Sequence, residues 1–220
     1  MEHDPGQEVA IPSGQVKVEG TLRLPPAASG VVVFAHGSGS GRFSVRNNFV
    51  AEALHAAGMG SLLIDLLTPD EDREYETRFD IALLTQRLAD ASSWLDAQAT
   101  TPALPVGLFG ASTGAAAALR VAAMPGSTIA ALVSRGGRPD LAGRVALEAV
   151  RAPTLLIVGG DDHDVLRLNQ DAYRLLHCEK RLDVVPGATH LFPEPGRLEE
   201  VAMMATSWFS SHFDVLRRRR

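Results

Sequence analysis

The sequence predicts an α/β fold, in which a mainly parallel, doubly wound sheet carries helices on both faces. Short runs of apolar and β-branched residues alternate along the chain with longer segments of helical spacing, and the connections are short. Most of the apolar runs lack the alternation of a half-exposed strand, which is typical of strands buried on both faces. The 220 residues contain no repeat, long linker or second apolar core, so we expect one domain over residues 1–220, with flexible tails at 1–6 and 215–220.

The expected elements follow from these patterns. Residues 7–11 and 15–24 alternate apolar and polar residues around Pro-Ser-Gly, which predicts an antiparallel hairpin at a sheet edge. Further strands are expected at residues 31–35, 61–66, 104–109, 129–133, 153–158 and 180–185, and helices at 45–57, 79–95, 115–119, 140–150, 164–176 and from 197 to beyond 208. Ser44 is placed to cap the helix that begins at residue 45. The segments between the central strands are too short to form a large cap domain.

Composition and charge narrow the class of protein. Hydrophobic residues make up 45% of the chain and charged residues 21%, as in ordinary globular proteins. The net charge is −5, and because residues 217–220 are four arginines, the rest of the chain is more acidic still, which argues against a nucleic-acid partner. The single cysteine, Cys178, excludes an internal disulfide, and we expect it to be a packing residue. No signal peptide or uninterrupted apolar span is evident, so we expect a soluble, cytoplasmic protein, monomeric or homodimeric, without a membrane partner.

A G-x-S-x-G sequence, Gly110-Ala-Ser-Thr-Gly114, lies between a predicted buried strand and an alanine-rich helix. This pattern fits a nucleophile elbow, a tight strand-to-helix turn that exposes the serine hydroxyl above the sheet. Side chains at 110 or 114 would collide where the strand doubles back, and the helix N-terminus directs N–H groups toward developing negative charge. The alternative is a simple glycine-rich turn.

Serine needs two further residues to act as a nucleophile. A histidine must take its proton, and a carboxylate must orient that histidine. His190 follows the last predicted strand, and three aspartates follow the strand before it: Asp161, Asp162 and Asp164. Because the carboxyl ends of parallel strands lie at one edge of a sheet, Ser112, one of these aspartates and His190 can converge there. Asp164 is also a candidate helix N-cap, and Asp161 a candidate solvated turn residue.

Acyl transfer also needs donors for the oxyanion. The N–H of the residue after the nucleophile, Thr113, supplies one donor. The loop after the first parallel strand supplies the other; we expect Ser38, with Gly39 as the alternative. This glycine-rich loop matches neither G-x-x-x-x-G-K-S/T nor G-x-G-x-x-G, so a nucleotide site is not indicated.

Several segments together carry a resemblance to a known family. They are His36-Gly-Ser-Gly-Ser-Gly41, Gly110-Ala-Ser-Thr-Gly114, Ser134-Arg-Gly-Gly-Arg-Pro-Asp140, Pro153-Thr-Leu-Leu-Ile-Val-Gly-Gly160 and Gly187-Ala-Thr-His-Leu-Phe192. From residue 31 to residue 209 the chain resembles a stand-alone α/β-hydrolase of the dienelactone-hydrolase-like group. The resemblance implies the α/β-hydrolase fold and a triad in the order Ser112, Asp162, His190, with Asp162 selected by the family spacing G-x-D-x-x-V. It also implies that His36 shapes its loop rather than acting as the base.

The residue at the nucleophile position distinguishes this chain from dienelactone hydrolases proper, which use cysteine there. Serine at 112 makes a serine esterase the nearer expectation. The sequence thus predicts hydrolysis of a small carboxylic ester or thioester, with no metal and no organic cofactor. Two alternatives stay open: acyl transfer or perhydrolysis by the same triad, and a non-catalytic ligand-binding protein on this fold.

Arginines gather near the predicted site. Arg42, Arg46, Arg135 and Arg138 lie in or beside loops at the expected active edge. Guanidinium groups bind carboxylates in a fork, so one hypothesis is that Arg135 or Arg138 holds an anionic group of the substrate. The alternative is that these arginines form surface ion pairs with the acidic segment 70–76. Met203, Met204 and Phe209 on the last helix are either core residues or part of a dimer surface.

Overall fold

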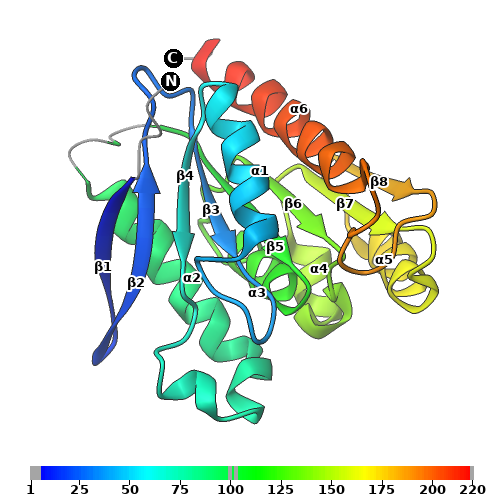
Figure 1. Ribbon diagram of the computed structural model, residues 1–220, viewed down its shortest axis with the longest axis horizontal. Coiled ribbons are helices and arrows are strands. Elements are labelled where there is room, and N and C mark those ends of the chain that lie inside the picture. Colours follow the sequence, from blue (N-terminus) through cyan, green and yellow to red (C-terminus); the bar gives the residue numbers. More distant parts are fainter. Residues whose placement is uncertain (1–5, 99–100, 102–103, 219–220) are drawn as a thin grey trace.

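The protein is described by a computed structural model that covers residues 6–98, 101 and 104–218. Eight strands form one sheet (Figure 1): β1 Gln7–Ser13, β2 Val16–Arg23, β3 Val31–Ala35, β4 Gly60–Ile64, β5 Val106–Ala111, β6 Ala131–Arg135, β7 Thr154–Gly159 and β8 Lys180–Val185. The strand order across the sheet is β1-β2-β4-β3-β5-β6-β7-β8. The predicted mainly parallel sheet is confirmed.

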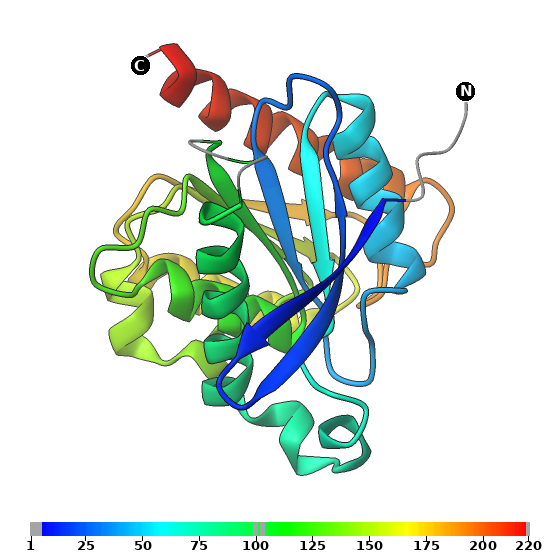
Figure 2. The ribbon, with the colours of Figure 1, turned by 90° about the vertical axis from the view of Figure 1, so that its left-hand side faces the viewer.

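The N-terminal hairpin lies at one edge, as predicted, and crosses the rest of the sheet at a steep angle (Figure 2). β1 pairs antiparallel with β2, and β2 pairs antiparallel with β4. Every pair from β4 to β8 is parallel. The carboxyl ends of these six strands therefore lie at one edge of the sheet, where ligands bind in open α/β folds.

Helices cover both faces of the sheet (Figure 1): α1 Val45–Ala56, α2 Ile81–Asp96, α3 Thr113–Ala122, α4 Arg144–Ala149, α5 His163–Leu175 and α6 Arg197–Arg218. Three short 3₁₀ helices are added at η1 Glu71–Arg73, η2 Glu76–Phe79 and η3 Pro139–Ala142. α1 and α6 pack side by side on one face, and α2 to α5 pack on the other. No separate cap domain covers the described strand ends.

Each face has its own apolar core. Phe34 and Phe109, whose ring centroids lie 5.0 Å apart, pack beneath α1 and α6 with Phe209. Gly107 makes room for Phe209, because a Cβ at residue 107 would lie 2.6 Å from the Phe209 ring. On the other face the four alanines at 115–118 are fully buried, so their small side chains let α3 approach the sheet closely.

Some predicted boundaries were wrong. β6 begins and ends two residues later than the predicted strand at 129–133, and the predicted helix at 140–150 is divided into η3 and α4 by Gly143. The acidic segment expected to be a loop contains η1 and η2. α6 continues to Arg218, so residues 215–218 of the expected C-terminal tail are helical, and residues 1–5 and 219–220 of the two expected tails lie outside the described residues.

The three hydrophobic residues noted on the last helix, α6, differ in burial. Phe209 is a core residue and Met204 packs against the same core, whereas Met203 is 65% exposed. At the edges, β1 contains Pro12 and β8 carries Lys180, Arg181 and Asp183. None of the described helices combines the length and the apolar composition needed to cross a bilayer.

Candidate active site

Ser112 lies in a strained turn between β5 and α3. Its φ of 49° and ψ of −120° are rare for a residue with a side chain, and such strain persists only where the surrounding structure imposes it. The flanking glycines impose it here. A Cβ at Gly110 would clash with the backbone of Ala115, and a Cβ at Gly114 with the carbonyl oxygens of Ala35 and His36. The predicted strained turn is therefore present, and the end of β3 leaves no room for a side chain at Gly114.

The backbone of the elbow is held by the next strand. Ser112 N donates to the Arg135 carbonyl at 3.3 Å, and Arg138 N donates to the Ser112 carbonyl at 3.0 Å. These two bonds fix the serine relative to the end of β6.

Asp162 and His190 form a close pair. His190 Nδ1 lies 2.7 Å from Asp162 Oδ2, and the Asp162 side chain is only 15% exposed. With the carboxylate ionised, Nδ1 carries the hydrogen of this bond, which leaves Nε2 with a free lone pair. That is the tautomer a general base requires.

The position of Asp162 corrects the prediction for Asp164. Asp162, not Asp164, stands at the N-cap of α5, and it makes no capping hydrogen bond because its carboxylate is turned toward His190. Asp164 lies in the first turn of α5 and pairs with Arg167 at 2.9 Å. Asp161 is exposed.

One small cavity joins the nucleophile to the histidine. It has a volume of about 210 Å³ and is lined by Gly37, Ser38, Ser40, Ser44, Arg46, Asn47, Ala111, Ser112, Arg135, His190 and Leu191. In the described structure no hydrogen bond links Ser112 Oγ to His190; the two side chains share the cavity wall. Catalytic hydrogen bonds of this kind are often long without substrate and tighten when it binds.

His36 fixes the loop that carries Ser38. The Leu66 N–H donates to His36 Nε2 at 2.9 Å, so Nδ1 carries the hydrogen and donates to the Gly37 carbonyl at 2.8 Å. Burial lowers the pKa of His36, which keeps the ring neutral. Both nitrogens are thus engaged with backbone groups, as expected for a structural histidine.

Of the predicted oxyanion donors, Thr113 follows the nucleophile directly in the chain, and Ser38 comes near it through the fold. Thr113 is the first residue of α3, and Ser38 lines the cavity beside Ser112. Gly37 allows this approach, since a Cβ there would lie 3.0 Å from Ser112 Cβ. Their role as N–H donors stays a prediction.

The two arginines predicted to bind substrate differ in position. Arg135 lines the cavity, is only 5% exposed, and donates to Asn47 Oδ1 at 3.2 Å. Burial and, secondarily, the charge of Arg46 lower the pKa of Arg135 to about 10, so it remains a cation at neutral pH. Arg138 is not among the residues that line the cavity and is bound by Asp140, at 2.9 and 2.7 Å, which raises the pKa of Arg138. Of the two, only Arg135 lies at the site.

Sequence reasoning missed Asn47. It lies in the first turn of α1, is 2% exposed, and lines the cavity. Its spacing of three residues from the cap Ser44, whose hydroxyl accepts from Asn47 N at 3.4 Å, marked the helix start. Nothing in that pattern indicated that the start of α1 faces Ser112.

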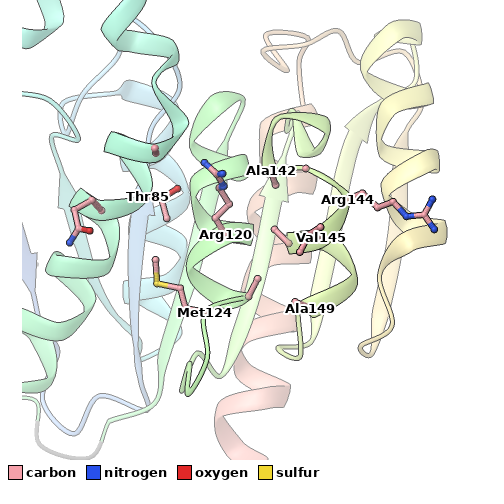
Figure 3. A pocket seen from close by; sticks show the side chains of 12 residues that line it. Thr85, Arg120, Met124, Ala142, Arg144, Val145 and Ala149 are labelled. Carbon is pink, nitrogen blue, oxygen red and sulfur yellow. The ribbon is translucent and has the colours of Figure 1, made fainter.

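A larger groove lies away from the candidate active site. A groove of about 600 Å³ between α2, α3 and α4 is lined by residues that include Thr85, Arg120, Met124, Val145 and several alanines (Figure 3). Neither Ser112, Asp162 nor His190 lines it. We call it the alanine groove below.

Comparison with solved structures agrees with the fold described above. No protein-family model matches the chain. The crystal structure of a dienelactone hydrolase from Anabaena variabilis is 52% identical, with a TM-score of 0.91 over 94% of this chain and 99% of that one. Est1E from Butyrivibrio proteoclasticus is only 15% identical but has a TM-score of 0.81 over 94% of this chain and 99% of its own, which shows the shared fold.

A curated relative carries a name that denotes a different activity from that of the hydrolases above. A Mycobacterium tuberculosis protein named "Putative phosphoribosyl transferase" is 57% identical over 206 residues, which are 94% of this chain but 46% of that protein. The chain thus spans about half the length of the curated relatives it matches. The Anabaena structure, in contrast, is matched over nearly its whole length at 52% identity. On that match, and on the eight-stranded sheet with its serine elbow, the chain belongs to the dienelactone-hydrolase-like group of α/β-hydrolases.

Proposed function

We propose that the protein is a serine hydrolase that cleaves a small carboxylic ester or thioester through an acyl-enzyme on Ser112. The observation that carries this proposal is the 2.7 Å contact between His190 and Asp162 at the cavity that holds the strained Ser112. The contact leaves His190 Nε2 free to take a proton, and the turn exposes the hydroxyl that must lose one.

In the acylation step Ser112 Oγ attacks the carbonyl carbon while its proton passes to His190 Nε2. The imidazolium is stabilised by Asp162, and the developing oxyanion is held by the N–H groups of Ser38 and Thr113. The bond to the leaving group then breaks, and the alcohol or thiol departs with the proton from His190.

In the deacylation step His190 takes a proton from water, and the hydroxide attacks the acyl-enzyme. The second tetrahedral intermediate collapses, Ser112 regains its proton from His190, and a carboxylic acid leaves. The net reaction is ester plus water to acid plus alcohol, and the chain's own residues perform every proton transfer.

The size of the cavity suggests the size of the substrate. Its volume of about 210 Å³ lies below the ~300 Å³ at which pockets for drug-sized ligands begin. We therefore expect short acyl groups to be preferred over long ones.

The first experiment is hydrolysis of p-nitrophenyl acetate by the parent protein and by Ser112→Ala, with circular dichroism to show that both are folded. We expect turnover in the parent only. Labelling by a fluorophosphonate, located at Ser112 by mass spectrometry, tests the nucleophile independently of substrate choice. A folded parent that is neither active nor labelled contradicts the proposal and favours a ligand-binding role.

Acyl transfer is the second candidate, because the acyl-enzyme can be attacked by an acceptor other than water. Adding hydrogen peroxide, alcohols or amines and measuring the ratio of the products separates transfer from hydrolysis. The phosphoribosyl transferase name belongs to a protein of which more than half lies outside the match. Nothing in the arrangement of Ser112, Asp162 and His190 favours that chemistry for this chain.

A further inference from the structure

Two arginines line the cavity beside Ser112, and neither has a carboxylate partner among the described residues. Arg135, at the end of β6, and Arg46, in the first turn of α1, both line it, and none of the described residues along its wall is acidic. The charge of Arg46 acts on Arg135 strongly enough to lower its pKa. In each side chain the buried Nε has no hydrogen-bond partner within the described part of the chain.

Two other arginines with largely buried side chains are paired with carboxylates. Arg42 binds Asp65, with Glu19 at 2.6 Å and Glu8 at 3.5 Å, and Arg87, which is as buried as Arg135, binds Glu71 at 2.7 Å. Burying a guanidinium without a counter-charge is unfavourable, so buried arginines are usually paired. Arg135 differs from the equally buried Arg87 in having no carboxylate partner among the described residues.

Further donors surround the same space. The side chain of Ser40 and the first turn of α1, a helix of twelve residues, border the cavity. The N-terminal turn of a helix presents free N–H groups and the positive end of its dipole. Asn47 holds Arg135 in place by accepting its hydrogen bond at 3.2 Å.

We infer that Arg135, Arg46 and the start of α1 form a subsite for a phosphate-type dianion on the ester substrate. Two guanidinium groups with no carboxylate match two negative charges, whereas a carboxylate would neutralise only one. A phosphate also has enough oxygen atoms to accept from both arginines and from the helix N-terminus at once. In our proposed reaction the phosphate would lie against α1 while the ester carbonyl lies over Ser112.

This inference rests on the proposed function only where it calls the anion part of a substrate. Its test therefore measures binding rather than turnover. The probe is inorganic phosphate, titrated by isothermal calorimetry into the parent protein, with acetate as the monoanionic comparison.

Two variants change the proposed subsite, and a third serves as a control. Arg46→Gln removes one charge from a half-buried position, Arg135→Lys keeps a charge but loses the fork, and Arg144→Gln is a control on the alanine groove. We expect phosphate to bind the parent about tenfold more tightly than acetate, about tenfold more weakly to Arg46→Gln, and unchanged to Arg144→Gln. Raised salt should weaken binding in the parent.

Two results would overturn the inference. Equal binding of phosphate by the parent and Arg46→Gln would show that the arginine pair is not the site, and acetate binding as tight as phosphate would show a carboxylate subsite instead. Repeating the titration with Ser112→Ala separates this outcome from failure of the proposed hydrolysis, because that variant retains both arginines. As an independent readout, phosphate should protect the parent, but not Arg46→Gln, from labelling at Ser112.

Discussion

The cavity beside Ser112 and the alanine groove differ in how their walls are built. The groove is almost three times larger and is lined by helical side chains, many of them alanine. The cavity forms at strand ends, and around it the fold carries a strained serine, a buried arginine and a histidine paired to an aspartate. The strained backbone and the buried guanidinium cost stability and persist only when the rest of the structure supports them. These costly features, rather than the volume of a pocket, are the reason for choosing the smaller cavity as the candidate site.

Replacing Ser112 is expected to give the largest difference in activity between the cavity and the groove. We expect Ser112→Ala to lower kcat for p-nitrophenyl acetate by about 10⁵-fold, because the triad acts as a unit. Val145→Ser in the alanine groove, at a side chain that is 83% exposed, should leave kcat unchanged. Steady-state kinetics on the two purified variants decides this, and an equal loss in both would move the reaction away from the cavity.

The next effect comes from Asp162. Asp162→Asn keeps the shape of the side chain but removes the charge that orients His190 and stabilises its protonated form, so we expect kcat to fall by about 10⁴-fold. Asp164→Asn, whose partner is the exposed Arg167, is the matched control and should retain full activity. A similar loss in both would assign the acid role to Asp164 or to neither residue.

The third prediction compares how much a side chain at a glycine lowers the free energy of unfolding in the two regions. Gly114→Ala places a Cβ against two carbonyl oxygens of the β3 end and should lower the free energy of unfolding by about 3 kcal/mol. Gly143→Ala beside the groove meets open space, so its only cost is the strain of φ 85° and ψ 152°, a conformation almost exclusive to glycine, and about 2 kcal/mol is expected. Urea unfolding measures both, and equal losses would show that the elbow is not tightly constrained.

The smallest effect concerns pH. Burial holds the pKa of His36 in the folded protein below the ordinary histidine value of 6.5, so the unfolded chain binds the extra proton and stability falls as pH drops below 6.5. The contribution is at most about 1.4 kcal/mol for each pH unit until the folded pKa is reached. Urea unfolding at pH 7.5 and 5.5 should show a smaller difference in His36→Gln than in the parent. An identical difference in the two proteins would mean that His36 is not held neutral.

Much of the fold was predictable because buried strands leave a strong signal. The runs in β3 and β7 are continuous and apolar, and each is buried along its whole length. The boundary of β6 was misplaced because Ser134 and Arg135 are polar yet buried in the strand. Hydrophobic patterns do not predict burial of that kind, which arises only from the pairing of β6 with β5 and β7.

The candidate site was predictable in part for a similar reason. G-x-S-x-G fixes a local turn, so Ser112 could be recognised without any tertiary contact. The local pattern left Asp161, Asp162 and Asp164 open, and only the family resemblance selected Asp162; which carboxylate turns toward His190, 28 residues away, is a tertiary fact. The contact of Asn47 with Arg135, 88 residues away, had no local signal.

The two edges of the sheet have a consequence for how the chain behaves before and after it folds. Pro12 removes one hydrogen-bond donor from β1, and the charged side chains of Lys180, Arg181 and Asp183 line β8. Open strand edges are templates for cross-β aggregation, and prolines and charges at these positions make pairing with a second edge unfavourable. A protein with six parallel strands must form many long-range contacts as it folds, which leaves apolar strands exposed for longer. The proline in β1 and the charged residues in β8 reduce the risk that two incompletely folded sheets pair at their edges during that time.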